Sequence, residues 1–302
     1  MKRFLLRVAL FCLIFFIIDK LFYVLLYNAP KLEADNRLEL LLNGKINKEV
    51  IIMGSSRGAY NIIAGQIEKE TGKTAYNISY AGSNIQFQLF LLKTLLRYNN
   101  APKIIILSID NPYEFLDVKS LEYRFDRLYP LEKYNYINDE LIRQNDKSEL
   151  LRFLYLGRIN RSSFTFTKKK MPIESPILPC GSMPFAVEAG KNNFKFEKKQ
   201  ERYPIEKELK DKREAFLEFQ KICKEKNIKL MYCFAPNFRV YNSVLANRIK
   251  SISLPENLLY VYDTTDLRYK KIEYFHDESH LNIEGAKLFS NELSKFINLG
   301  KN

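Results

Sequence analysis

The chain is poor in the residue types that bind zinc in proteins. Of its 302 residues, two are histidines and four are cysteines, and no two cysteines form a C-x-x-C pair. A structural zinc site normally takes closely spaced cysteine and histidine ligands, so we expect no metal, and nothing indicates a cofactor. One cysteine, Cys12, lies in the apolar N-terminal stretch. The three others are Cys180, Cys223 and Cys233. Because three is an odd number, at least one thiol is free, so cysteine usage does not identify the compartment.

Signals for nucleic-acid binding are also missing. The formal net charge is +13 at pH 7, which suits nucleic acid, an anionic membrane surface or an acidic polymer. The basic residues are spread along the chain, and the densest run is only Lys168-Lys169-Lys170. There is no zinc-finger spacing, no RNA-binding aromatic signature and no basic helix with interleaved aromatics. We therefore expect a solvated basic surface and no nucleic-acid partner.

One long apolar run is present, from Phe4 to Tyr27. As a helix its roughly 24 residues cover about 36 Å, enough to cross a bilayer core of about 30 Å. Arg7, Asp19 and Lys20 interrupt it. Arg7 can reach the membrane surface with its long side chain. Asp19 and Lys20 are adjacent and deeper, so they are expected to pair with each other or to face a protein partner.

Two other interpretations of this run remain open. It is either a signal peptide with Val8 to Ile18 as its apolar region, or a buried amphipathic helix. No small-x-small cleavage site follows, and a second apolar block continues to Tyr27, which favours an uncleaved anchor at residues 1–28. The basic residues before and within the run keep the short N-terminus in the cytoplasm. The prediction is a single-pass protein of a bacterial inner membrane, with residues 29–302 periplasmic or otherwise extracytoplasmic.

Short apolar runs then alternate with helix-like segments. Strands are predicted at 49–53, 74–78, 103–109, 228–234 and 258–262, and helices at 61–71, about 85–97, 204–227, 240–251 and 282–297, the first stopped by Gly72 and the last capped by Asn282. Such alternation predicts a parallel sheet flanked by helices.

The pattern breaks down at about residues 113–203. This stretch is rich in Tyr, Asn, Arg and Lys and contains several prolines. A compact α/β domain rarely needs so long an irregular segment. We interpret it as an insertion within one domain of residues 29–302. It either covers the active face as a substrate-binding lid or is a mobile surface segment.

A candidate nucleophile follows the first strand, in Gly54-Ser55-Ser56-Arg57-Gly58. A serine between a strand and a helix is held at the end of the sheet, near the positive end of the helix dipole. Acyl transfer requires a nucleophile with donors for an oxyanion nearby, so Ser56 is the candidate. A phosphate-binding turn or a plain loop would have the same sequence.

Both histidines lie in Phe275-His276-Asp277-Glu278-Ser279-His280-Leu281-Asn282. Asp277 precedes His280 by three residues, which lets its carboxylate bind one ring nitrogen while the other takes a proton from Ser56. His280 is then the general base and Asp277 its orienting acid. Three alternatives remain: a histidine at a helix start, an acidic surface loop, and a metal site that also uses His276 and Glu278, although this spacing is no recognised ligand pattern.

Residues 54–58 also match the G-x-S-x-G turn of α/β-hydrolases. Two features oppose that fold: the turn follows the first strand, and the acid lies just before the histidine. The chain instead resembles the SGNH (GDSL-type) esterase superfamily, in particular its membrane-anchored branch, which includes proteins similar to the teichoic-acid D-alanylation factor and the alginate O-acetylation proteins. The resemblance covers about 49–110 and 228–297.

Four sequence blocks carry this resemblance. The first is Gly54-Ser55-Ser56, with serine in place of the usual aspartate; the second is Gly82 after the second strand; the last is Asp277-Glu278-Ser279-His280. The third block is displaced, and Asn111 in Ser108-Ile109-Asp110-Asn111 is its candidate asparagine.

The resemblance implies a three-layer, flavodoxin-like α/β domain with its site at the carboxyl ends of the strands. It also implies an oxyanion hole made by the backbone N–H groups of Ser56 and Gly82 and by the Asn111 side chain. Arg57 either binds an acidic group of the substrate or forms a structural ion pair, with Asp110 or another carboxylate.

The expected function is that of a membrane-anchored serine esterase or O-acyltransferase. Its substrate would be an acylated cell-envelope glycan or polymer, which the basic surface suits if the polymer is anionic. The alternative is a non-catalytic SGNH-fold protein that assembles with a membrane acyltransferase.

Overall fold

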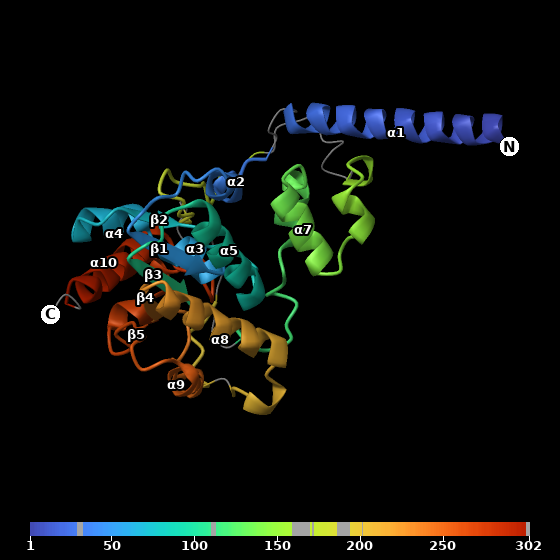
Figure 1. Ribbon diagram of the computed structural model, residues 1–302. Coiled ribbons are helices and arrows are strands. Elements are labelled where there is room, and N and C mark those ends of the chain that lie inside the picture. The colour runs from blue at the N-terminus through green and yellow to red at the C-terminus, as the bar shows by residue number, and fades with distance from the viewer. Residues whose placement is uncertain are drawn as a thin grey trace. The chain divides into compact units, whose positions relative to one another are not determined.

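The computed structural model describes residues 1–28, 33–109, 113–158, 170, 172–185, 194–200 and 202–299. The chain divides into two compact units (Figure 1). Met1–Ala34 and Arg124–Lys170 form one, here called the N-terminal unit. Asp35–Tyr123 and Met171–Asn302 form the other, here called the sheet unit.

The sheet unit is built around five parallel strands in the order β2-β1-β3-β4-β5. They are β1 (Val50–Gly54), β2 (Ala75–Asn77), β3 (Ile104–Ser108), β4 (Lys229–Phe234) and β5 (Leu258–Val261). Every residue of the central strands β1 and β3 is buried, which explains their nearly continuous apolar sequences. The predicted fold class is confirmed, and the strand order is that of flavodoxin-like folds.

Helices cover both faces of this sheet (Figure 1). One layer contains α3 (Ser56–Asn61), α4 (Ala64–Thr71) and α10 (Ile283–Leu299), and the other contains α2 (Arg37–Leu42), α5 (Ile85–Tyr98), α8 (Lys210–Glu225) and α9 (Ser243–Ile252). The chain reverses direction across the sheet after β2. Since parallel crossovers are right-handed, the connections before and after β2 lie on opposite faces.

The helix after the first strand differs from its prediction. A single helix starting at Asn61 was wrong, because α3 begins at Ser56 and α4 follows after a two-residue break. Gly58 allows α3 to lie close to the end of β2: a Cβ atom at this position would be 2.6 Å from Ser79 Oγ. Gly72 ends α4 in the left-handed conformation, with φ of 69°, as predicted.

The stretch at about 113–203 is divided between the two units, and its described part contains short helices that were not predicted. In the N-terminal unit it forms α6 (Phe125–Leu128), α7 (Asn135–Arg143) and short 3₁₀ turns at Tyr129–Leu131, Glu149–Arg152 and Leu156–Arg158. Ile137 and Leu141 are fully buried on one side of α7. Two apolar residues four apart in a polar sequence were too weak a signal to predict this helix.

The N-terminal unit begins with α1 (Lys2–Asn28). Among the described residues it is the one helix long and apolar enough to cross a membrane. Its first 17 residues, up to Ile18, are exposed, and burial begins at Asp19.

The cap of α10 gives a first testable expectation. Asn282 Oδ1 accepts hydrogen bonds from the backbone N–H groups of Glu284 (3.1 Å) and Gly285 (3.0 Å), and its Nδ2 donates to Glu273 O (2.7 Å). We expect Asn282→Ala to lower the free energy of unfolding by about 1–2 kcal/mol, measured by urea denaturation. Asn282→Ser keeps a side-chain acceptor for the cap and should retain more of this stability than Asn282→Ala. Equal losses in both variants would contradict the capping explanation.

Candidate active site

Ser56 lies at the junction of β1 and α3, at the carboxyl end of the sheet. It is the first residue of α3 and is partly exposed, whereas Ser55 before it is fully buried. The first N–H groups of a helix have no acceptor within the helix, and that of Ser56 is one of them. The hydroxyl and a backbone donor that the helix itself does not use therefore come from the same residue.

His280 reaches Ser56 from the loop before α10. Its Nε2 lies 2.8 Å from Ser56 Oγ, and its Nδ1 lies 2.9 and 3.0 Å from the two carboxylate oxygens of Asp277. Asp277 Oδ1 also accepts the backbone N–H groups of Ser279 (2.7 Å) and His280 (2.9 Å). The structure thus brings together all three residues predicted to be catalytic.

The charge of Asp277 determines which ring nitrogen of His280 carries hydrogen. Burial raises the pKa of the Asp277 carboxyl, but the hydrogen bond and charge of the His280 ring, with two backbone N–H groups, lower that pKa more, so it lies below the ordinary 3.8. An ionised carboxylate only accepts hydrogen bonds, so Nδ1 must be the donor. In the neutral form of the ring, Nε2 is then the acceptor for the Ser56 hydroxyl, as a general base requires.

This pKa also predicts an acid dependence of stability. Because folding lowers the pKa of Asp277, its carboxylate stabilises the fold fully above about pH 4, and this contribution is lost as the pH falls below the folded pKa. Asp277→Asn should therefore be less stable than the parent at pH 7, and the difference should shrink as the pH falls below about 4. Urea denaturation at several pH values measures it. A difference that stays constant with pH would contradict the assignment.

Two polar side chains that sequence reasoning missed fix the end of α3 against the histidine loop and the break after α3 against α10. Asn61, fully buried, accepts the backbone N–H of Leu281 on its Oδ1 (3.0 Å). Ser290 Oγ of α10 accepts the backbone N–H of Ile63 (2.8 Å). Their partners lie more than 200 residues away in the chain, so no local pattern identifies them.

Gly82, a predicted oxyanion donor, lies in a turn next to Ser55. Its φ of 74° is in the left-handed region, which favours glycine. Its N–H donates to Ser55 Oγ (3.1 Å), and the neighbouring Ser83 hydroxyl donates to Gly54 O (3.2 Å). The turn is therefore attached to the end of β1. To bind an oxyanion the Gly82 N–H must leave Ser55 or be shared with it, and this role stays a prediction.

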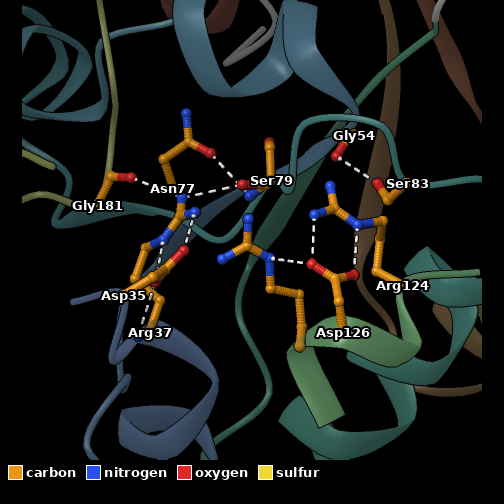
Figure 2. A network of polar contacts seen from close by, with 10 residues as sticks. Asp35, Arg37, Gly54, Asn77, Ser79, Ser83, Arg124, Asp126 and Gly181 are labelled. Atoms are coloured by element: carbon orange, nitrogen blue, oxygen red, sulfur yellow. Dashed lines mark hydrogen bonds and ion pairs between the residues drawn. The ribbon is translucent and has the colours of Figure 1, made fainter. Parts of the chain in front are cut away.

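A buried ion pair holds the backbone that leads into this turn (Figure 2). Arg37 is 1% exposed and binds the Asp35 carboxylate through Nη2 (2.7 Å) and Nε (3.0 Å). Its Nη1 donates to the carbonyls of Ser79 and Gly181, each at 2.9 Å. Asn77 Oδ1 accepts the Ser79 N–H (2.9 Å). Residues remote in sequence thus position the end of β2.

Aromatic rings border His280. The Phe185 ring stacks on His276 with centroids 3.7 Å apart, and Tyr60 contacts His280 edge-on at 5.2 Å. Within the described ranges, no group of three or more His, Cys, Asp and Glu side chains is placed to hold a metal. Both ring nitrogens of His280 already contact Ser56 and Asp277. The geometry therefore favours a base over a metal ligand.

Of the other three predicted residues, Arg57, Asp110 and Asn111, the structure describes only Arg57. Arg57 is 5% exposed. Burial raises the pKa of the Tyr262 hydroxyl to about 12, and the charge of Arg57 opposes this shift, so the guanidinium lies near Tyr262. Its role in binding substrate stays a prediction. Asn111, the third predicted oxyanion donor, and Asp110, a proposed partner of Arg57, lie outside the described residues.

Comparison with known proteins does not assign the chain to a family. No protein-family model and no curated protein matches the chain. One similar solved structure is a crystal structure of a Bacteroides fragilis protein described as a "putative acylhydrolase". The two chains are 12% identical, and the match covers 88% of this chain and 94% of the other, with a TM-score of 0.42.

Proposed function

We propose that the chain is a serine hydrolase of the SGNH type that acts on ester bonds through an acyl-serine intermediate. The contact that carries this proposal is the 2.8 Å distance between His280 Nε2 and Ser56 Oγ, with Asp277 bound to the other ring nitrogen. A nucleophile, its base and an orienting acid in this order are the parts that acyl transfer needs.

The reaction follows from the hydrogen positions. Ser56 Oγ attacks the ester carbonyl while His280 Nε2 takes the hydroxyl proton, and Asp277 stabilises the imidazolium that forms. The backbone N–H groups of Ser56 and Gly82 are the proposed donors to the oxyanion, together with the Asn111 side chain. His280 then gives its proton to the leaving alcohol. Water releases the acyl group from Ser56 in hydrolysis, and a sugar hydroxyl accepts it in transfer.

The proposed setting is a bacterial cell envelope. In this proposal α1 anchors the chain in the inner membrane and the sheet unit lies on the extracytoplasmic side. The apolar character and length of α1 support anchoring. The proposed substrate is an acylated envelope glycan or polymer, and the net charge of +13 suits an anionic one.

The alternative, a non-catalytic assembly partner of a membrane acyltransferase, requires no activated serine. A fluorophosphonate probe separates the two, because its phosphorus bonds to an activated serine oxygen as fluoride leaves. We expect the full-length protein in detergent to be labelled, Ser56→Ala and His280→Ala to lose the label, and Ser55→Ala to keep it. An unlabelled parent, or a label retained by Ser56→Ala, would overturn the proposal.

A further inference from the structure

The charged pair that interrupts the apolar run of α1 is bound by a later part of the N-terminal unit. Asp19 is fully buried, and its Oδ1 accepts the backbone N–H of Leu156 (2.8 Å). Lys20 Nζ donates to Asp19 Oδ2 (2.9 Å) and to the carbonyl of Phe153 (2.8 Å). The two residues pair with each other, as expected, and the protein they face is their own chain.

Tyrosines continue this contact toward the end of α1. The rings of Tyr23 and Tyr155 have centroids 4.2 Å apart, and Tyr27 contacts Tyr134 edge-on at 6.3 Å. Lys20 Nζ also lies 4.4 Å from the centre of the Tyr155 ring. Tyrosine and lysine with these neighbours are typical of the boundary between a bilayer and water.

The backbone of residues 149–158, here called the membrane-proximal segment, limits how deep this boundary can lie. The segment consists of two 3₁₀ turns joined by irregular backbone. Irregular backbone exposed to lipid does not occur in the hydrocarbon region, because its polar groups would have no partners. Since Phe153 and Leu156 bind Lys20 and Asp19 directly, that pair also lies at or outside the hydrocarbon boundary.

The length of α1 then brings the segment against the bilayer. Only Lys2 to Ile18 is left to cross the hydrocarbon, and as a helix this part is about 26 Å long. That is slightly less than the hydrocarbon thickness of about 30 Å, so no spacer separates the bilayer from the membrane-proximal segment. Two large apolar side chains of this segment are exposed, Leu150 at 65% and Phe153 at 72%.

We propose that the membrane-proximal segment docks on the lipid bilayer, with Leu150 and Phe153 inserted at the boundary between headgroups and acyl chains. This inference rests on the membrane anchoring included in the proposed function. It makes the attachment two-part: α1 crosses the membrane, and the segment that binds Asp19 and Lys20 lies on its surface. Exposed apolar side chains at this depth are then covered by lipid.

The absence of tryptophan from the chain makes the proposal directly measurable, because any introduced tryptophan is the sole one. The full-length Phe153→Trp protein is placed in vesicles of phosphatidylcholine and phosphatidylglycerol whose acyl chains carry bromine either near the headgroup or near the chain end. We expect the Phe153→Trp emission to lose most of its intensity with the shallow bromine and less with the deep one. Iodide in the water should quench it weakly.

Two further single-tryptophan proteins separate the possible results. Phe11→Trp, in the exposed first part of α1, tests anchoring alone and should be quenched most by the deep bromine. Leu267→Trp, at a 67% exposed position of the sheet unit, gives the response of a tryptophan open to iodide. If Phe11→Trp is not quenched by either bromine, the membrane anchor of the proposed function fails, and the docking surface with it.

If bromine quenches Phe11→Trp, the membrane anchor stands. Three results with Phe153→Trp would then still overturn the docking surface. Phe153→Trp could respond to iodide as Leu267→Trp does, which means that the segment lies in water. It could be shielded from both quenchers, which means that protein, such as a second copy of the chain, covers it. It could be quenched most by the deep bromine, which places the segment in the hydrocarbon.

Discussion

Replacing Ser56 with alanine is expected to lower kcat for ester hydrolysis by about 10⁴-fold or more. The hydroxyl is the group that His280 Nε2 contacts at 2.8 Å, and without it no acyl-enzyme forms. His280→Ala should cause a loss of similar size, because a serine hydroxyl without a base is a poor nucleophile. Initial rates with an activated acetyl ester and each purified full-length variant measure both effects.

A variant that combines both substitutions tests whether Ser56 and His280 act as one unit. Residues that act as a unit are strongly non-additive, so Ser56→Ala with His280→Ala should be about as slow as either single variant. If the two losses multiplied, the residues would act independently and the triad would be wrong. Circular dichroism of each variant checks that the fold is retained, since Ser56 is partly exposed and its loss leaves no large cavity.

Arg37→Met is expected to lower the free energy of unfolding by about 3–5 kcal/mol. The substitution leaves the Asp35 carboxylate buried without its bidentate partner, and it also frees the carbonyls of Ser79 and Gly181. Urea denaturation measures the loss. Because Ser79 lies just before the Gly82 turn, the variant should also have a lower kcat at temperatures where it remains folded.

Two comparisons test the cause of this loss. Arg202→Met removes an exposed ion pair with Glu206, whose side chains are 85% and 61% exposed, and should change stability by less than about 1 kcal/mol. Adding Asp35→Asn to Arg37→Met removes the unpaired buried charge and should restore part of the stability. If the double variant is no more stable than Arg37→Met, the uncompensated carboxylate is not the main cost.

The parts of the fold that the sequence predicted are those with strong local patterns. The strands β1 and β3 are apolar runs bounded by polar residues, and Gly72 and Asn282 are residue types that end and begin helices. The short helix α3 was missed because six residues with the sequence SRGAYN show no apolar period. Its start at Ser56 depends on the close approach of Gly58 to Ser79, which is a tertiary contact.

The sequence predicted the residues of the candidate site that would carry the chemistry. It did not predict the residues that hold them in position. Ser56 and His280 are distinctive residue types in distinctive places, and parallel strands deliver their carboxyl ends to one edge of the sheet. The residues that hold the site in position are common polar residues whose partners are distant in sequence. Arg37, for example, donates a hydrogen bond to the carbonyl of Gly181. Phe185 lies in a stretch with no periodicity, so its stacking on His276 had no signal in the sequence.

The contact between Ser56 and His280 joins residues 224 positions apart. Under the proposed function, this separation determines when during synthesis the serine becomes reactive. During synthesis the nucleophile leaves the ribosome long before its base. A serine hydroxyl without a general base is weakly nucleophilic, so a growing or truncated chain that ends before residue 280 carries an inert Ser56. The hydrogen bond between Ile63 and Ser290 adds a later requirement, because α10 must pack before the break between α3 and α4 is fixed. Under the proposed function, the chain therefore cannot cleave or transfer acyl groups while it is still being made and exported.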